Sequence, residues 1–267
     1  MPYTPAHPIT AIVLDKLFPR KLNRTGLVLG TMAPDLQNFA ELRPTDTDFG
    51  HSTLGMFTLG LPASIVLAFA FHRLVLPAAA VYLPAPLNRI AGSYVQRGWR
   101  INGLRGWALL IASIVLGMYS HLFLDGFSHR GGLMYPLSTG AVQWLLPGIR
   151  SPGSLLQFGL SVLGIAVELL LLAIFVYRRR HIGSSAGEDG QTLPRIGRSG
   201  KALFWLAVLS GTVLVTAFGF WLYSSPHSHR GLIIVPVAPL SGAVVGLLAA
   251  SALHALMRKK TSSQLQQ

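Results

Sequence analysis

Five long blocks of apolar residues constrain the fold of this chain more than any other feature. They cover residues 54–76, 107–127, 155–177, 202–223 and 232–257. A helix needs about 20 mostly apolar residues to cross a hydrocarbon core about 30 Å thick, and each block reaches that length. Apolar residues make up 51% of the chain and charged residues only 12%, unlike a typical soluble domain. The sequence predicts an all-α integral membrane bundle of about five transmembrane helices plus short N-terminal helices.

Composition divides this predicted single membrane domain into segments. They are an N-terminal motif segment (1–53), the first three spans (54–177), a flexible Gly/Ser-rich loop (178–201), the last two spans (202–257) and a polar tail (258–267). Loops of this composition rarely carry chemistry. Functional residues are therefore expected in the motif segment and beside the spans.

The net charge of +13 suggests nucleic acid as a partner, but the distribution of the charge argues against it. The basic residues fall mainly in loops between spans, with five in 73–106 and six in 178–201, and they form no face interleaved with aromatics. Basic residues beside spans report orientation and contact with anionic lipid. Membrane lipids, not nucleic acids, are the expected partners.

The same loops predict an orientation. The positive-inside rule places them and the C-terminus in the cytoplasm, and the N-terminal segment on the extracytoplasmic side of the cell membrane. Against this, residues 1–53 also hold five basic residues, and the apolar stretch 8–14 is too short for a secretory signal. Translocating that segment would need help from short apolar pieces that dip into the membrane. Cysteine is absent, so disulfides and thiol catalysis are excluded and the redox compartment is undetermined.

Two short apolar pieces precede the first span. Residues 8–17 have helical apolar spacing, with Pro8 suited to a first helical position and Pro19 to a stop. Residues 25–33 are apolar and end at Pro34. Neither piece can span a bilayer. We expect short helices lying on, or partly within, the membrane face.

The stretch YSHLFLDGFSHRGG, residues 119–132, closes the second block and carries His121, Asp125 and His129 at intervals of four. Each four-residue step on an α-helix turns about 40° beyond a full circle and rises about 6 Å, so the three side chains would line one stripe. Imidazole and carboxylate are ligands that zinc and related divalent ions favour. The spacing predicts a metal site.

The spacing of these residues favours two metal ions over one, and a site without any metal is the alternative. His121 and His129 would lie about 12 Å apart along the helix, too far to share one ion easily. His121 and Asp125 would then bind one metal, and Asp125 would bridge to a second metal held by His129. The plain alternative is a helix end whose polar groups meet water.

Three more polar positions precede the first span: His7, Asp35 and His51. Each alone can be a turn residue or a helix cap. Together with His121 and Asp125 on one membrane side, they form a candidate set of ligands. His229, in a second copy of the sequence SHRG at residues 228–231, and His227, just before that copy, are weaker candidates.

Glu168 lies well inside the third block. An ionisable residue at that depth is costly and marks a functional hypothesis. It is either a protonated residue hydrogen-bonded between helices or part of a transport path.

The opening MPYTPAHP, then GTMAPD at 30–35, HS at 51–52 and SHLFLDGFSH at 120–129 resemble an uncharacterised bacterial family of integral membrane proteins. The resemblance covers most of the chain. The order of ligands is also similar to that of membrane-bound metal-dependent hydrolases and, more distantly, of zinc-dependent phospholipase C.

The phospholipase resemblance implies Asp35, His51, His121 and Asp125 as ligands of a first metal, with Asp125 bridging, and His7 as the N-terminal ligand. It implies a helical bundle whose zinc cluster hydrolyses phosphodiesters. This chain lacks the phospholipase's N-terminal Trp and its later His-x-x-x-Glu pair. One or two ions, with zinc as the expected metal, fit better than three.

Three functions follow as hypotheses. The first is a membrane-embedded metal-dependent hydrolase acting on a lipid or phosphoester substrate, in which Arg130 would pair with a phosphate. If Asp35 is not a ligand, it would serve as the base for water. The second is a transporter or channel using the His/Asp cluster and Glu168. The third is a non-catalytic membrane protein with a closed structural metal site. The sequence does not give the oligomeric state.

Overall fold

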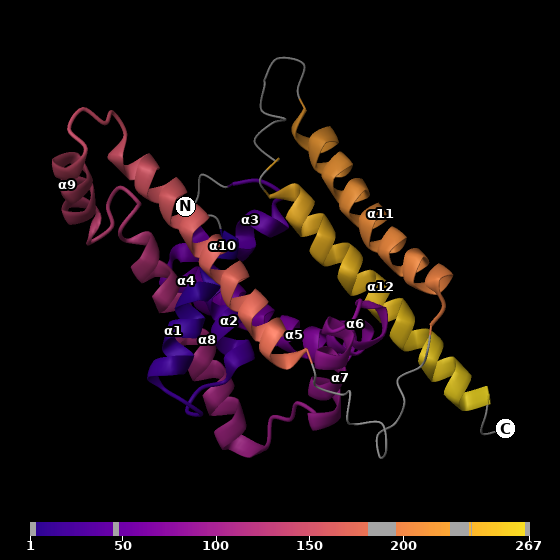
Figure 1. The fold of residues 1–267 in the computed structure, drawn as a ribbon. Coiled ribbons are helices and arrows are strands. Elements are labelled where there is room, and N and C mark those ends of the chain that lie inside the picture. Colours follow the sequence, from indigo (N-terminus) through magenta and orange to yellow (C-terminus); the bar gives the residue numbers. More distant parts are fainter. Residues whose placement is uncertain (1–3, 45–47, 181–195, 225–234, 236, 265–267) are drawn as a thin grey trace. The chain divides into compact units, whose positions relative to one another are not determined.

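The structure is a computed structural model that describes residues 4–44, 48–180, 196–224, 235 and 237–264 (Figure 1). These residues form helices and contain no β-strand. Five helices are long and apolar enough to cross a membrane. They are Thr53–Tyr82, Gly103–Asp125, Pro152–Arg179, Arg198–Tyr223 and Ala238–Arg258. The predicted all-α membrane fold is confirmed. The candidates His227 and His229 lie outside the described residues.

The first of these long helices contains two wide turns. It is built from α4 (Thr53–Gly55), η4 (Met56–Gly60), α5 (Leu61–Ala70), η5 (Phe71–Val75) and α6 (Leu76–Tyr82), with π-type turns at η4 and η5. Each wide turn ends two residues before a proline, Pro62 or Pro77. Proline lacks the N–H that an α-helical ladder requires, and a π-type turn lets the helix continue past it.

The chain divides into two compact units. Unit 1 comprises Met1–Leu36, Thr47–Ala68 and Arg100–Ile174, and unit 2 comprises Gln37–Asp46, Phe69–Trp99 and Phe175–Gln267. Every candidate ligand from His7 to His129 belongs to unit 1. That the chain acts as a single membrane domain stays a prediction.

Unit 1 is centred on α8 (Gly103–Asp125), beside which α1 (Pro8–Leu17) and α2 (Arg24–Met32) form a hairpin (Figure 1). Helix α1 starts at Pro8 and ends before Pro19, as predicted. Asn23 caps α2: its side chain accepts the N–H of Gly26 at 2.9 Å. The N–H of Asn23 itself donates to Ser113 Oγ at 2.8 Å, which fixes the hairpin loop halfway along α8.

Glycines allow α2 and α8 to cross in backbone contact. A Cβ added at Gly30 would fall on the backbone of Ile114, and one added at Gly117 would lie 2.5 Å from the carbonyl oxygen of Leu27. Small residues permit such close approach between membrane helices, where van der Waals contact drives association. The crossing places Thr31 beside the last two turns of α8.

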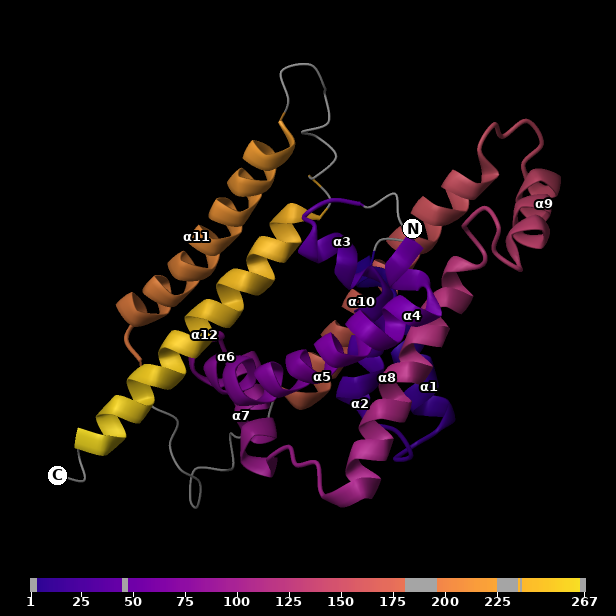
Figure 2. The same cartoon turned by 180° about the vertical axis from the view of Figure 1, so that it is seen from behind.

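Short turns and two further helices complete unit 1. They are η1 (Thr4–Ala6), η2 (Ala33–Asp35), η3 (Asp48–His51), α9 (Tyr135–Leu145) and α10 (Pro152–Arg179), whose last residues belong to unit 2. Figure 2 shows α9 beside the C-terminal end of α8 and the N-terminal end of α10.

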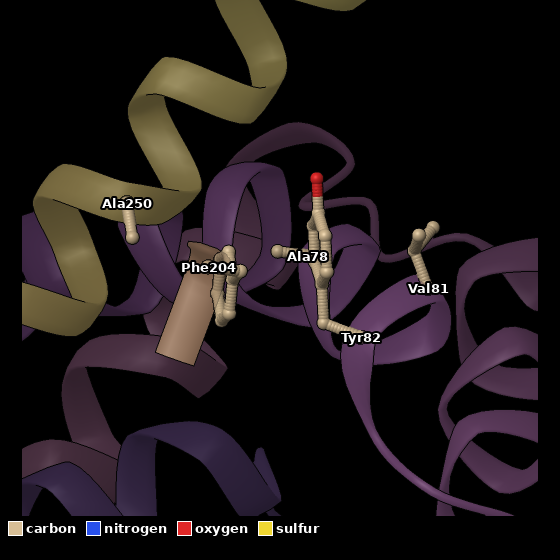
Figure 3. Packing of buried hydrophobic residues seen from close by; sticks show 5 residues of the cluster. All are labelled: Ala78, Val81, Tyr82, Phe204 and Ala250. Atoms are coloured by element: carbon tan, nitrogen blue, oxygen red, sulfur yellow. The ribbon is translucent and has the colours of Figure 1, made fainter. Parts of the chain in front are cut away.

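Unit 2 pairs α11 (Arg198–Tyr223) with α12 (Ala238–Gln264) and adds α7 (Leu87–Arg97) and α6. Gly211, Gly242 and Gly246 lie in backbone contact across the α11–α12 crossing. At one end of the pair, the ring of Tyr82 stacks on Phe204 at 4.0 Å between centroids and 7° between planes (Figure 3). The buried cluster there also includes Ala78, Val81 and Ala250.

Candidate metal centre

Five of the predicted site residues meet at the C-terminal end of α8. His7 directly precedes α1, Asp35 ends η2, His51 ends η3, and His121 and Asp125 form the last turn of α8. The side chains of His7, Asp35 and His121 are 0% exposed, that of Asp125 is 8% exposed and that of His51 is 21% exposed. The five side chains form a buried polar cluster that opens toward His51.

The two oxygens of Asp125 face different partners. Oδ1 lies 3.2 Å from His7 Nε2. Oδ2 lies 3.4 Å from His51 Nε2 and 3.3 Å from His121 Nε2. A carboxylate placed this way could bridge two ions. The bridge expected from the helical spacing ran to a second metal held by His129, whereas the histidine nitrogen nearest to Oδ1 is that of His7.

The other ligand atoms are spaced as a metal site requires. Nε2 of His51 lies 3.2 Å from Nε2 of His121 and 3.6 Å from Oδ1 of Asp35. His121 Nε2 and Asp35 Oδ2 are 3.9 Å apart. Two donors bound tetrahedrally to one zinc-like ion, at bond lengths near 2.0–2.1 Å, lie about 3.4 Å from each other. Either of two overlapping triads could hold an ion: His7, His121 and Asp125, or Asp35, His51 and His121.

Backbone carbonyls fix which histidine nitrogen faces the cluster. Nδ1 of His121 lies 2.8 Å from the carbonyl oxygen of Thr31, and Nδ1 of His7 lies 3.3 Å from that of Thr4. A carbonyl oxygen only accepts, so in each neutral ring Nδ1 carries the proton and Nε2 presents a lone pair to the cluster. Ligating histidines in metal sites use their other nitrogen in this way. In the neutral tautomers of His7 and His121, unprotonated nitrogens and carboxylate oxygens therefore converge, an arrangement that a bound cation would stabilise.

Burial favours the neutral form of His7, which is the form that could bind a metal. Desolvation lowers the pKa of His7 and outweighs the opposing effect of the hydrogen bond that the protonated ring donates to the Asp125 carboxylate. The rings of His7 and His121 stack at 3.8 Å between centroids. Stacked neutral rings avoid the repulsion that two imidazolium ions would suffer at that distance.

Two hydroxyl contacts support the ligands, and the sequence did not single them out. Thr4 Oγ1 donates to Asp35 Oδ2 at 2.6 Å, inside the buried cluster. Thr10 and Ser120 join α1 to α8 through a hydroxyl contact of 2.9 Å, next to His121. The only sequence signal for Thr4 is its place in the opening motif with His7.

The structure departs from the sequence expectation at His129. Helix α8 ends at Asp125, so the predicted helical stripe through His129 is wrong. Residues 126–132 turn instead, because the chain reverses tightly: a Cβ at Gly132 would fall on the backbone of Gly126. His129 Nδ1 hydrogen-bonds to the carbonyl oxygen of Asp125 at 3.1 Å and lies 3.7 Å from Asp125 Oδ1. His129 is outside both triads, with a side chain 37% exposed, and Arg130 is exposed beside it.

Glu168 of α10 contacts the start of α1. The Glu168 carboxyl group interacts with the backbone N–H of Ile9, in the first turn of α1, and its buried Oε1 has no hydrogen-bond partner among the described residues. One turn earlier on α10, Gly164 packs so closely on Ala6 that an added Cβ would lie 2.9 Å from the Ala6 Cβ. The first-turn N–H groups of a helix have no partner within it, and a carboxyl group there satisfies one of them. Because Ala6 and Ile9 flank His7, α10 fixes the position of that ligand.

The fold and the cluster define a helical membrane protein with a buried His/Asp centre. The chain belongs to a family described as a domain of unknown function (DUF4184), whose model matches residues 1–255. No curated protein and no solved structure matches the chain. The expected membership of an uncharacterised family is thereby confirmed.

Proposed function

We propose that the protein is a membrane-embedded, metal-dependent hydrolase whose centre is formed by His7, Asp35, His51, His121 and Asp125. The observation that carries the proposal is the convergence of atoms that can bind a metal ion. Three Nε2 atoms and two carboxylates face one another at 3.2–3.9 Å. One or two divalent ions satisfy that set, and zinc suits its nitrogen and oxygen ligands.

An ion in this centre would supply Lewis acidity, activating water and polarising the oxygen of the bond to be cut. The protein's side chains would do the rest. Asp35, fully buried and fixed by Thr4, is suited to be a ligand more than a mobile base. His51, the most exposed ligand, borders the side from which substrate enters.

A phosphoester fits the surroundings of the centre. Arg130 is exposed next to His129, at the turn that follows Asp125, and a guanidinium pairs with two phosphate oxygens at once. In the reaction, the oxygen of water adds to phosphorus, the ester P–O bond breaks, and the leaving alkoxide takes a proton. The similarity in ligand order to membrane-bound metal-dependent hydrolases supports this class of reaction.

Orientation forms part of the proposal. The basic loops and the positive-inside rule favour a cytoplasmic C-terminus and an extracytoplasmic centre in the cell membrane. A cysteine-accessibility scan tests this side assignment, because the chain has no natural cysteine. Labelling of a cysteine at exposed Arg130 by an impermeant reagent is expected in intact cells, and labelling only after lysis would contradict it.

Metal content tests the centre itself. Asp125→Asn removes the negative charge of the carboxylate that faces the Nε2 atoms of His7, His51 and His121, so we expect metal affinity to fall by more than about 100-fold. The matched control is Asp15→Asn, because Asp15 pairs with Arg24 at the surface of the same unit. Elemental analysis of detergent-purified protein should find one or two zinc-like ions in the wild type and control. Full retention of metal by a folded Asp125→Asn protein would contradict the centre.

Hydrolysis is tested separately, with phosphodiester and carboxylic ester substrates offered to metal-loaded protein. Wild-type turnover that Asp125→Asn abolishes and Asp15→Asn preserves is the expected result. Bound metal without any turnover would instead support a non-catalytic protein with a structural metal site.

A further inference from the structure

Helix α9 has an apolar stripe that the described part of the chain does not cover. Leu137, Ala141, Trp144 and Leu145 recur at positions i, i+4, i+7 and i+8, the spacing of a single helix face. Leu137 is 71%, Trp144 80% and Leu145 66% exposed, and none of the eleven residues of α9 is buried. Gln143 lies on the opposite face.

The topology places α9 at one surface of the bilayer. It joins α8 to α10, and both of these helices are candidate spans, so residues 126–151 lie at a single side of the membrane. Eleven helical residues extend about 16 Å and cannot cross the hydrocarbon core. Residues 131–149 contain no charged side chain, while Arg130 and Arg150 flank them. Tryptophan and flanking arginines are typical of the headgroup layer.

Helix α9 is also fixed to the turn that borders the metal centre. Ser138 Oγ donates to the carbonyl oxygen of Phe127, two residues after Asp125. The Tyr135 ring packs against Gly153 at the start of α10. The depth of α9 in the membrane therefore sets the depth of the turn that carries His129 and Arg130.

The exposed surface of the spans continues onto this helix. Phe123 in the last turn of α8 and Phe158 in the second turn of α10 are 62% and 71% exposed, and Leu133 before α9 is similarly uncovered. Exposed apolar side chains on membrane spans face lipid. The stripe of α9 extends that lipid-facing surface around the end of the spans.

We propose that α9 lies in the plane of the membrane interface, with its Leu137–Trp144–Leu145 stripe in the bilayer, and that it gives the neighbouring metal centre a preference for phospholipids over soluble phosphoesters. Headgroups at that depth are level with Arg130 and with the partly exposed His51 and His129. A soluble phosphoester would have to approach the same ligands through the headgroup layer. This inference rests on the proposed hydrolase function for the substrate, but not for the position of α9.

The position of α9 can be measured without any enzymatic assay. Single cysteines at Leu137, Trp144 and Gln143 would carry nitroxide labels in an otherwise cysteine-free chain, reconstituted in vesicles of phosphatidylcholine and phosphatidylglycerol. We expect labels at Leu137 and Trp144 to collide more with oxygen than with an aqueous nickel chelate, at a depth of about 5–10 Å, and the label at Gln143 to do the reverse. Equal access of nickel to all three labels would overturn the proposal. A second outcome would also overturn it. If the label at Trp144 shows spin–spin broadening that disappears on dilution with unlabelled protein, a second copy of the chain covers the stripe.

The substrate preference is tested with Trp144→Glu and the matched control Gln143→Glu. Trp144→Glu should lower hydrolysis of vesicle phospholipid about tenfold and leave metal content and hydrolysis of a soluble bis(nitrophenyl) phosphate unchanged. Gln143→Glu should change neither activity. Wild-type protein that cleaves the soluble diester and not the phospholipid would overturn the preference. Protein that cleaves neither would remove the hydrolase function, while the nitroxide labels would still decide where α9 lies.

Discussion

The α2–α8 pair in unit 1 and the α11–α12 pair in unit 2 both cross at glycines, but different kinds of side chain lie at the end of each pair. In both, glycines bring two helices into backbone contact, at Gly30 and Gly117 in one and at Gly211 and Gly246 in the other. The α11–α12 pair ends on aromatic packing around Tyr82. The α2–α8 pair ends on four buried His and Asp side chains and the partly exposed His51.

This comparison shows which features of unit 1 concern helix packing and which concern the candidate site. A glycine crossing brings helices together wherever they lie, so it is no sign of function. What distinguishes unit 1 is that the crossing aligns the Thr31 carbonyl with His121 and leaves Nε2 pointing into the cluster. The same close approach in unit 2 aligns apolar side chains. Breaking each crossing should therefore have different consequences.

Enlarging a glycine at each crossing should have the largest effect. Leu at Gly117 cannot fit against the Leu27 carbonyl, so Gly117→Leu should separate α2 from α8 and abolish metal binding. Gly246→Leu overfills the α11–α12 crossing in the same way and should destabilise the protein by about 1–3 kcal/mol or more while metal remains bound. Elemental analysis and thermal unfolding in detergent measure both. Metal loss in Gly246→Leu but not in Gly117→Leu would reverse the comparison.

A smaller effect is expected from the hydroxyl that supports Asp35. Thr4→Val removes the donor at 2.6 Å and should weaken metal binding by about 10–100-fold without unfolding the chain. Thr58→Val is the matched control, because Thr58 donates only to the Leu54 carbonyl of its own helix. Competition with a chromogenic chelator gives both affinities. Equal affinities would mean that Asp35 is held without Thr4.

Glu168 should give the smallest effect. Glu168→Leu removes the acceptor for the Ile9 N–H and should weaken metal binding about threefold to tenfold through His7, whereas Glu168→Gln keeps an acceptor and should stay within about twofold. The same chelator competition measures both. If Gln is as damaging as Leu, the ionised carboxylate itself matters, and the transport hypothesis gains support.

The sequence predicted what local patterns specify. Apolar blocks of sufficient length gave the membrane helices, and Pro8 with Pro19 bounded α1. The short polar motifs predicted that His7, Asp35 and His121 belong together, and they do lie together. The helices and their ends depend on residues near one another in the chain. The site residues could be predicted because His and Asp beside membrane spans often have a functional role.

Other features were beyond a sequence reading. The end of α8 at Asp125 depends on the tight Gly126–Gly132 reversal, so the four-residue spacing to His129 suggested a helix that does not exist. The role of Thr31 is carried by a backbone carbonyl, which every residue type has. The pairing of Glu168 with Ile9 joins residues far apart in the chain, and no periodicity reports it.

The contact between His7 and Asp125 has a consequence for how the protein is made. The two residues are 118 positions apart, and a ribosome adding about 5–20 residues per second needs about 6–24 s to go from one to the other. Throughout that interval the nascent N-terminal hairpin has no α8 to pack on. Under the proposed function, an ion that arrived early would meet an incomplete set of ligands and could leave again. The insertion of the second span, not the synthesis of the opening motif, would therefore set the moment at which an ion becomes trapped.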